Sequence, residues 1–104
     1  MSKHDRESLS DIFHHTLGIA NVYFQPPSNM KIQYPCLVYK RVGWDETQAD
    51  DQLYTAQPHY QLTWITKDPD SEMPLQLLKT FRMIRHASHF TSDNLYHDTF
   101  DLYF

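Results

Sequence analysis

Glycine and cysteine are nearly absent from this chain. Its two glycines, Gly18 and Gly43, are isolated from each other, which argues against a glycine-rich phosphate loop and against a flexible linker. Cys36 is the single cysteine, so a disulfide within the chain is excluded and a reducing compartment fits the composition.

Long apolar runs and concentrated positive charge are also missing. Apolar runs last only a few residues and residues 1–7 are polar and charged, so we expect neither a membrane partner nor a signal peptide. The formal net charge is −4. The nearest approach to basic clusters is Lys40 with Arg41 and Arg82 with Arg85, which is too sparse for a surface that grips DNA.

What the chain has in abundance is aromatic side chains, with seven Tyr, six Phe and two Trp among 104 residues. A chain of this length forms one domain, residues 1–104, with one modest core. The core of so small a domain cannot enclose all of these rings. Aromatic side chains that carry a polar group suit protein–protein contacts, so the composition favours an assembly subunit.

The first third of the chain predicts a helix followed by strands. Apolar residues recur at helical spacing over residues 6–17, and Gly18 is placed to end that helix. Residues 21–25 are a short β-type run, and the proline-rich residues 26–35 predict a loop. The apolar residues within 36–42 fall on both faces of the predicted strand, as expected of a central or interface strand.

An acidic segment, residues 43–52, follows. It contains Asp45, Glu46, Asp50 and Asp51 and no basic residue, which predicts a solvated loop or the tip of an extended hairpin. A divalent-cation site is the alternative, but the four acids lack the spacing, glycine and closing glutamate of a calcium loop.

The second half predicts a strand, a helix and two further strands. Residues 53–66 have β character, and Asp70 or Ser71 is placed to cap a helix. Met73, Leu77, Phe81 and Ile84 share one face of that helix.

The last two predicted strands flank a turn at residues 92–94. Phe100, Leu102 and Phe104 point to one side of the final strand. The whole pattern predicts an α+β domain, a mainly antiparallel sheet of about four to five strands with two helices packed on one face.

Catalytic and metal-binding patterns are weak. His86 and His89 would share a face on a helix, but on the predicted strand they fall on opposite faces, which disfavours a metal site. Cys36 follows a proline within an apolar strand and is interpreted as a buried structural thiol. His97 and Asp98 are neighbours on a strand, so their side chains diverge. We expect no catalytic residue, no cofactor and no metal ligand.

Four blocks of sequence, taken in order, resemble a known family. They are NVYFQPPSNMKIQYPCLVY, ADDQLY, YQLTWITKDPDSEMP and FTSDNLYHDTFDLYF, which together run from residue 21 to residue 104. The set resembles short proteins from the structural gene blocks of tailed bacteriophages, called tail terminator, tail completion, neck or minor capsid proteins. The order of elements is similar to the lambda-like tail terminator fold. Residues 79–86 depart from the family pattern, being longer and more basic.

The resemblance implies a non-enzymatic virion subunit at the head–tail joint. Such proteins form a homo-oligomeric ring, typically six-fold, that terminates the tail tube and meets the head connector. The implied partners are the tail tube protein and a head-completion or connector protein, with genomic DNA passing through the lumen without specific binding. The expected location is the neck of the virion, and the host cytoplasm during assembly.

Two sets of residues are predicted to serve such a ring. The acidic residues Asp45, Glu46, Asp50 and Asp51 are predicted to face the lumen, where their charge would repel the DNA backbone. The predicted subunit interface comprises Tyr23, Phe24, Tyr39, Arg41 and Tyr54. Three alternatives stay open: a head-closure or head–tail adaptor protein, a small metal-dependent enzyme that uses His86, His89 and the acidic residues, and a protein that binds host proteins.

Overall fold

The N-terminal helix ends where the apolar spacing predicts. The computed structural model describes residues 6–49 and 52–104, with the backbone alone for 45–49 and 52–56. Helix α1 (Arg6–Asp11) continues into a π-helical turn, η1 (Ile12–Thr16). Gly18 follows with a φ of +70°, a left-handed conformation that glycine adopts without strain, so the predicted helix end is confirmed.

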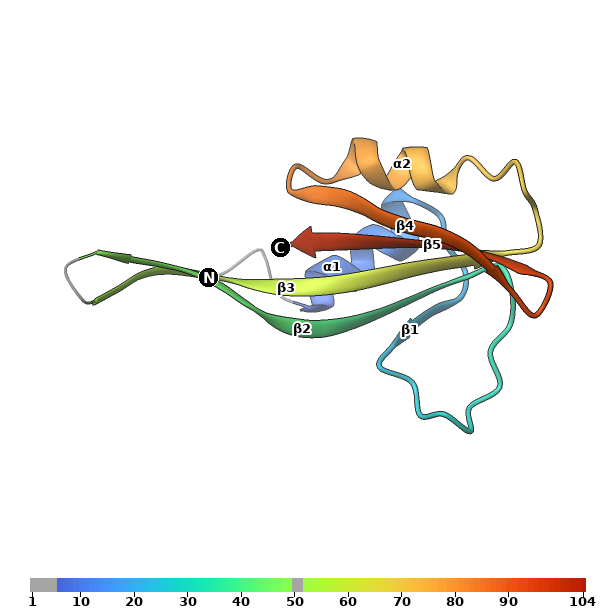
Figure 1. Ribbon diagram of the computed structural model, residues 1–104, viewed down its shortest axis with the longest axis horizontal. Coiled ribbons are helices and arrows are strands. Elements are labelled where there is room, and N and C mark those ends of the chain that lie inside the picture. Colours follow the sequence, from blue (N-terminus) through green and yellow to red (C-terminus); the bar gives the residue numbers. More distant parts are fainter. Residues whose placement is uncertain (1–5, 50–51) are drawn as a thin grey trace.

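Five strands form one mixed sheet. They are β1 (Val22–Phe24), β2 (Cys36–Ala49), β3 (Gln52–Thr66), β4 (Ile84–Ser92) and β5 (Leu95–Tyr103). Their order across the sheet is β1-β2-β3-β5-β4 (Figure 1). Only the short pair β1–β2 is parallel, and the three other pairs are antiparallel. The structure is therefore α+β, as the sequence predicts.

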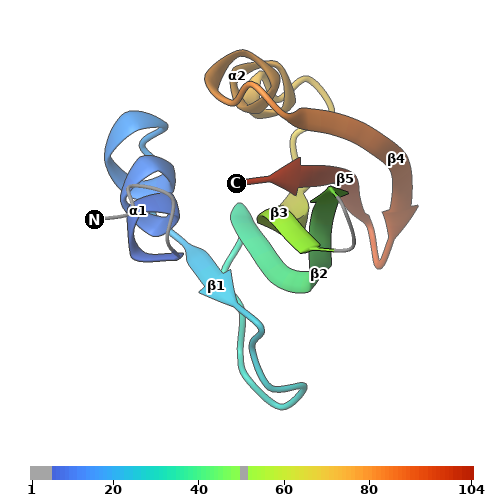
Figure 2. The same cartoon turned by 90° about the vertical axis from the view of Figure 1, so that its left-hand side faces the viewer.

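Both helices cover the same face of the sheet (Figure 2). Side chains from α1, η1 and α2 (Met73–Thr80) meet the inward side chains of β2, β3 and β5 in one core cluster, against which residues of β1 and β4 also pack. Its fully buried members include Leu9, Phe13, Leu77, Phe100 and Leu102. A smaller cluster of Cys36, Ile65 and Leu95 lies among the alternate strand positions, where the loop residue Ile32 packs against it. The predicted alternation of β5 is confirmed.

The hairpin β4–β5 is closed by two residues with left-handed backbone. Asp93 and Asn94 have φ values of 54° and 63°. Positive φ at both central residues matches the twist of the flanking strands, and Asp and Asn tolerate this conformation better than most residues. The predicted turn at residues 92–94 is therefore confirmed.

The second helix is shorter than predicted. Helix α2 ends at Thr80, and Phe81 adopts an extended conformation with φ −107° and ψ 144°. Ile84 belongs to β4, so its assignment to the helical face was wrong. The error has a simple cause, since Met73, Leu77, Phe81 and Ile84 all contact the same core cluster although only the first two lie on the helix.

The start of α2 also differs from the prediction. Glu72 is the N-cap residue and makes no side-chain bond to the helix. Ser71 Oγ accepts a hydrogen bond from the backbone N–H of Met73 at 3.3 Å, and from the indole N–H of Trp64 at 3.1 Å. The backbone N–H of Asp70 donates a hydrogen bond to Asp68 Oδ1. Ser71 therefore joins the helix to the sheet, and Asp70 belongs to the preceding turn.

Strands β2 and β3 continue beyond the body of the domain as a two-stranded ribbon (Figure 1). Residues 44–49 pair with residues 52–58, whereas β5 pairs with β3 only from His59 onward. Residues 44–49 and 52–57 are here called the arm. Register shifts occur next to Val42 and between Thr47 and Gln48. The arm gives the molecule its longest dimension, in extents of 50 × 30 × 26 Å.

The arm corresponds to the acidic segment of the sequence. Asp45 and Glu46 lie on β2. For this part of the segment the prediction of an extended hairpin is therefore confirmed, and that of a loop is wrong. Asp50 and Asp51 lie outside the described residues. Among the described residues, no helix is long and apolar enough to cross a membrane.

Candidate functional site

A bulge in β4 brings two histidines to the same side of the sheet. His86 is opposite Phe100 and Ser88 is opposite Thr99, so Ala87 is an extra residue between them. A bulge of this kind re-aims the side chains that follow it. The prediction that His86 and His89 fall on opposite faces was therefore wrong, because it assumed an unbroken alternation.

The two histidines converge on one buried carboxylate. His86 Nε2 lies 3.0 Å and His89 Nδ1 lies 2.8 Å from the same oxygen, Oδ1 of Asp98. Asp98 is only 9% exposed. The His86 ring meets the Phe100 ring edge-on, and the His89 ring stacks on Tyr96. The cluster thus satisfies a buried acceptor and fastens β4 to β5.

This geometry indicates a structural cluster. Within residues 6–44 and 57–104, whose side chains are described, no group of three or more His, Cys, Asp or Glu side chains is arranged to hold a metal ion. The ring nitrogens nearest Asp98 are engaged by its oxygen. A buried carboxylate needs such donors to offset its lost hydration.

A second histidine–carboxylate pair ties β3 to β5. His59 Nε2 lies 2.9 Å from Asp101 Oδ1, and the His59 ring stacks on Tyr103 with 4.5 Å between centroids. Like the first cluster, this pair joins neighbouring strands across the sheet and so contributes to sheet stability.

Cys36 is fully buried in the smaller cluster. Burial raises the pKa of its thiol to about 11. The nucleophilic form of cysteine is the thiolate, which is scarcely populated at neutral pH with such a pKa. The prediction of a structural thiol is confirmed.

Of the predicted interface residues, Tyr39 lies in the core. It is 2% exposed, and its ring contacts those of Phe13, Phe24 and Tyr60. A side chain enclosed within its own subunit is not available to a neighbour, so the assignment of Tyr39 to the interface was wrong. Its polar hydroxyl suggested surface exposure, but the apolar ring determines its position.

Tyr23 and Phe24 lie half-buried on β1. The hydroxyl of Tyr23 accepts a hydrogen bond from the backbone N–H of Gln33 at 3.2 Å, which holds the proline-rich loop. The guanidinium of Arg6 lies 4.8 Å above the centroid of the Phe24 ring, a cation–π contact that joins α1 to the sheet edge.

Arg41 lies at the root of the arm. Its guanidinium donates to the Tyr60 hydroxyl at 3.1 Å and lies over the Trp44 ring at 5.7 Å. Trp44 is 56% exposed, so this contact forms part of the molecular surface. Tyr54 lies on β3 next to the second register shift, and its side chain is outside the description.

Several large apolar side chains are exposed that the sequence analysis did not single out. They are Met30, Tyr34, Val42, Trp44, Leu75, Leu78, Met83 and Phe90. The segment MPLQLLKT of α2 holds four large apolar residues in eight positions, more than one buried stripe requires. That excess was the available indication that part of α2 faces outward. Exposed apolar groups of this size suit a protein partner.

Two hollows of about 400 Å³ flank the connection between α2 and β4. The first lies at one end of the core and is lined by Ile12, Gln57, Thr80, Phe81, Arg82, Met83, Leu102, Tyr103 and Phe104. The second is lined by Arg82, Met83, Ile84, Arg85, Asp101 and Tyr103. Lys79, Arg82 and Arg85, here called the basic rim, are all exposed.

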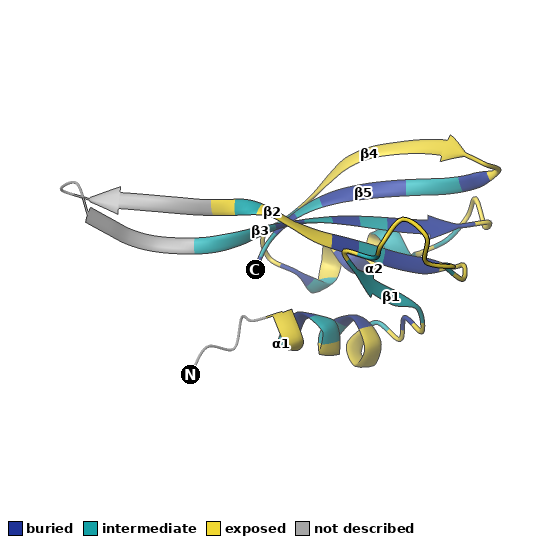
Figure 3. Ribbon diagram, turned by 90° about the horizontal axis from the view of Figure 1, so that it is seen from below, coloured by how far each residue is buried: buried dark blue, intermediate teal, exposed yellow. Residues whose placement is uncertain are grey.

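The outer strand β4 is exposed along nearly its whole length (Figure 3). It ends the sheet opposite β1, so its outward backbone groups have no neighbouring strand among the described residues. The surfaces open to a partner are therefore the arm with its root, the basic rim with its hollows, and the β4 edge. Comparison with protein-family models, with curated proteins and with solved structures finds no match for this chain.

Proposed function

We propose that the protein is a tail terminator of a tailed bacteriophage, a structural subunit that forms a ring at the head-proximal end of the tail tube. The observation that carries the proposal is the arm, a paired ribbon that leaves the body of the domain (Figure 1). A two-stranded ribbon alone is at best marginally stable in water. A neighbouring subunit provides the missing packing surface, and repeated contacts of one kind close into a ring.

The phage assignment is supported by the four ordered sequence blocks that resemble the tail terminator and neck family. The α+β architecture, with two helices on one face of the sheet, is the class that this resemblance implies. Within that architecture the arm includes the described residues of the ADDQLY block, and the KDPDSEMP segment holds the start of α2 against Trp64.

The contacts of the titratable groups suit an architectural role. The clusters around Asp98 and Asp101 join adjacent strands, and the thiol of Cys36 is buried. In a ring subunit these groups stabilise the sheet on which the assembly surfaces are carried.

The proposed ring, six-fold as the sequence resemblance implies, stops tube growth and presents its other side to the head connector. Genomic DNA passes through its lumen. Asp50 and Asp51 are proposed to face the lumen and to repel phosphate. Replacing both by asparagine is expected to alter DNA ejection. Unchanged ejection kinetics and infectivity would contradict this placement.

The experiment that tests the terminator function is the assembly of purified protein, alone and with its tube protein. Light scattering and negative-stain imaging are expected to show rings, free or at one end of each tube, and tube polymerisation should stop at those ends. Protein that leaves tube growth unchanged but binds the head connector would identify the head-closure adaptor instead.

A matched control is a variant without the arm. Because Gly43 is opposite His59, residues 44–58 can be replaced by Asn-Gly, which forms a tight two-residue hairpin turn. The body should stay folded by circular dichroism, and ring formation should be lost. An armless variant that still caps tubes would contradict the role given to the arm.

A further inference from the structure

We propose that the arm of one subunit docks by its β2 edge on the basic rim of the next, so that the strand edge that carries Asp45 and Glu46 lies against Lys79, Arg82 and Arg85 of its neighbour. This inference rests on the proposed ring and names the contact that closes it. The partner is therefore a second copy of this chain.

The basic rim is a dense concentration of positive charge in an acidic protein. Its three cations fall within residues 79–85, and the whole chain has nine Lys and Arg against 13 Asp and Glu. All three are exposed. None of them makes a salt bridge with a residue of 6–44 or 57–104, the part of the chain whose side chains are described. Asp101, opposite Arg85 across the strands, is engaged by His59 at 2.9 Å. The rim thus keeps its charge for an external partner.

The surface around the rim is shaped to receive a chain segment. A hollow of about 400 Å³ lies on each side of the connection that carries Arg82. Met83, between them, is 50% exposed. Exposed apolar surface flanked by arginine is typical of the central part of a protein–protein interface.

The arm complements this surface in charge and needs a partner. Residues 43–52 contain four acids and no Lys, Arg or His. Each strand of the arm has six residues, which at ~3.3 Å per residue gives a length of about 20 Å. Both outer edges of this ribbon lack a neighbouring strand among the described residues. A flat edge without a partner is a site of pairing or docking.

The arm does not cover the rim of its own subunit. Gln57, at the base of the arm, lines the first hollow, and from there the ribbon points away from the body (Figure 1). The donor and acceptor surfaces on one copy are different, so the contact is heterologous. Repetition of a heterologous contact by rotation produces a closed ring. Asp45 and Glu46 then lie at the interface, and Asp50 and Asp51 remain for the lumen.

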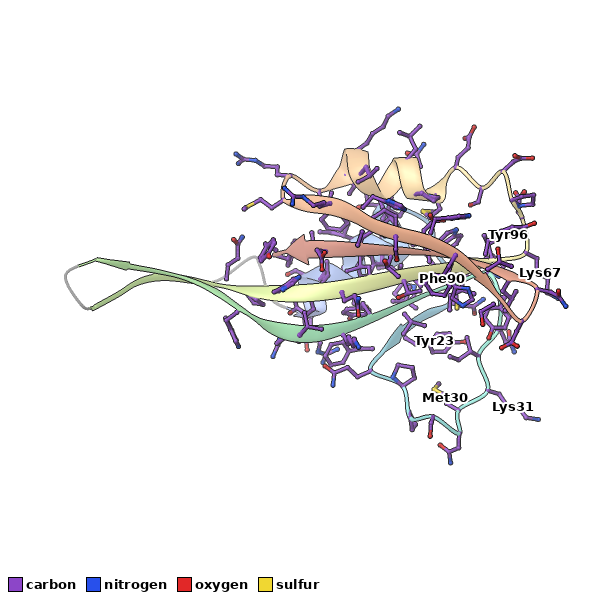
Figure 4. All side chains as sticks on the ribbon, in the orientation of Figure 1. Tyr23, Met30, Lys31, Lys67, Phe90 and Tyr96 are labelled. Atoms are coloured by element: carbon purple, nitrogen blue, oxygen red, sulfur yellow. The ribbon has the colours of Figure 1, made fainter. Side chains whose placement is uncertain are left out.

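The test reverses charge on each side of the contact separately and then on both. The variants are Arg82→Glu with Arg85→Glu, Asp45→Lys with Glu46→Lys, and all four together. The control is Lys31→Glu with Lys67→Glu, which changes the net charge as the rim reversal does but lies at the end of the molecule opposite the arm (Figure 4). Assembly is measured by sedimentation velocity, and folding by circular dichroism.

Each single-side reversal is expected to raise the apparent dissociation constant of the ring about a hundredfold, because like charges across an interface oppose association. The four-residue swap should restore assembly, and the lysine control should assemble as the wild type does. Assembly of the rim variant at wild-type concentrations would overturn the docking contact and leave the ring function standing. Wild-type protein that forms no ring, alone or with tube protein, would overturn the proposed function itself.

A second measurement does not depend on weakened variants. A Glu46→Cys copy is mixed with a Met83→Cys copy and treated with a short bismaleimide. The native thiol of Cys36 is buried and remains protonated, so it reacts little. A crosslinked dimer that forms only in the mixture supports the contact. Wild-type-like rings without this crosslink would refute it.

Discussion

Replacement of Asp98 by alanine tests whether the histidine cluster is structural. The carboxylate oxygen accepts two hydrogen bonds, at 2.8 and 3.0 Å, and is nearly buried. Hydrogen bonds to charged groups contribute roughly 1.5–3 kcal/mol each when well buried. The side chains of His86 and His89 are 38% and 52% exposed and rehydrate when released. We therefore expect each of the two hydrogen bonds to contribute about 1 kcal/mol, so that Asp98→Ala lowers the free energy of unfolding by about 2 kcal/mol.

The assay is thermal unfolding followed by circular dichroism. Unfolding entropy is about 2.1 cal/mol/K per residue, so for 104 residues a loss of about 2 kcal/mol lowers Tm by about 9 °C. The matched control is Asp101→Ala, which removes a single bond to His59 at a more exposed site. Its Tm should fall by about 4 °C or less.

Two results would refute this interpretation of the cluster. The first is an Asp98→Ala variant that unfolds at the wild-type temperature. The second is a wild-type Tm that rises with added Zn²⁺ and falls with a chelator, while the variant responds to neither. That pattern would show that the three side chains bind metal, and would revive the enzyme alternative.

Three further substitutions test other contacts. Ser71→Ala removes the acceptor of the Trp64 indole N–H, which is nearly buried, and should lower the free energy of unfolding in urea by about 1–2 kcal/mol. The Cβ added by Gly18→Ala would meet no atom within 4 Å, but it places alanine at a φ of +70°. Chemical denaturation should therefore show a free energy of unfolding that is lower by about 1 kcal/mol. The raised pKa of Cys36 adds stability below pH 9.0 that is lost as pH rises through about 11. The Cys36→Ala variant should therefore show a shallower fall of the free energy of unfolding between those two pH values. A slope equal to that of the wild type would contradict this prediction.

The parts of the fold that the sequence predicted correctly depend on local rules. The end of the first helix follows from the left-handed conformation that Gly18 adopts. The β4–β5 turn follows from Asp93 and Asn94, and the core face of β5 from strict alternation ending at Phe104. Each of these features is decided within a few residues, so a single sequence contains the information.

The parts that were missed depend on contacts between distant segments. The end of α2 at Thr80 is set where Phe81 turns into the core. The bulge at Ala87 follows from pairing with β5, and without it the convergence of the two histidines on Asp98 could not be foreseen. The basic rim was seen in the sequence as a departure from the family pattern, but its hollows exist only in the folded chain.

The two tryptophans differ in environment, and this makes the protein its own fluorescent reporter. Trp64 is nearly enclosed and its indole N–H is bonded to Ser71, whereas Trp44 is more than half exposed at the root of the arm. An enclosed indole emits at shorter wavelength than one in water. Loss of the short-wavelength component therefore follows the melting of the core, and a shift in the long-wavelength component follows contact at the arm. With Trp44→Phe and Trp64→Phe as references, fluorescence can separate unfolding of the chain from the proposed contact between subunits.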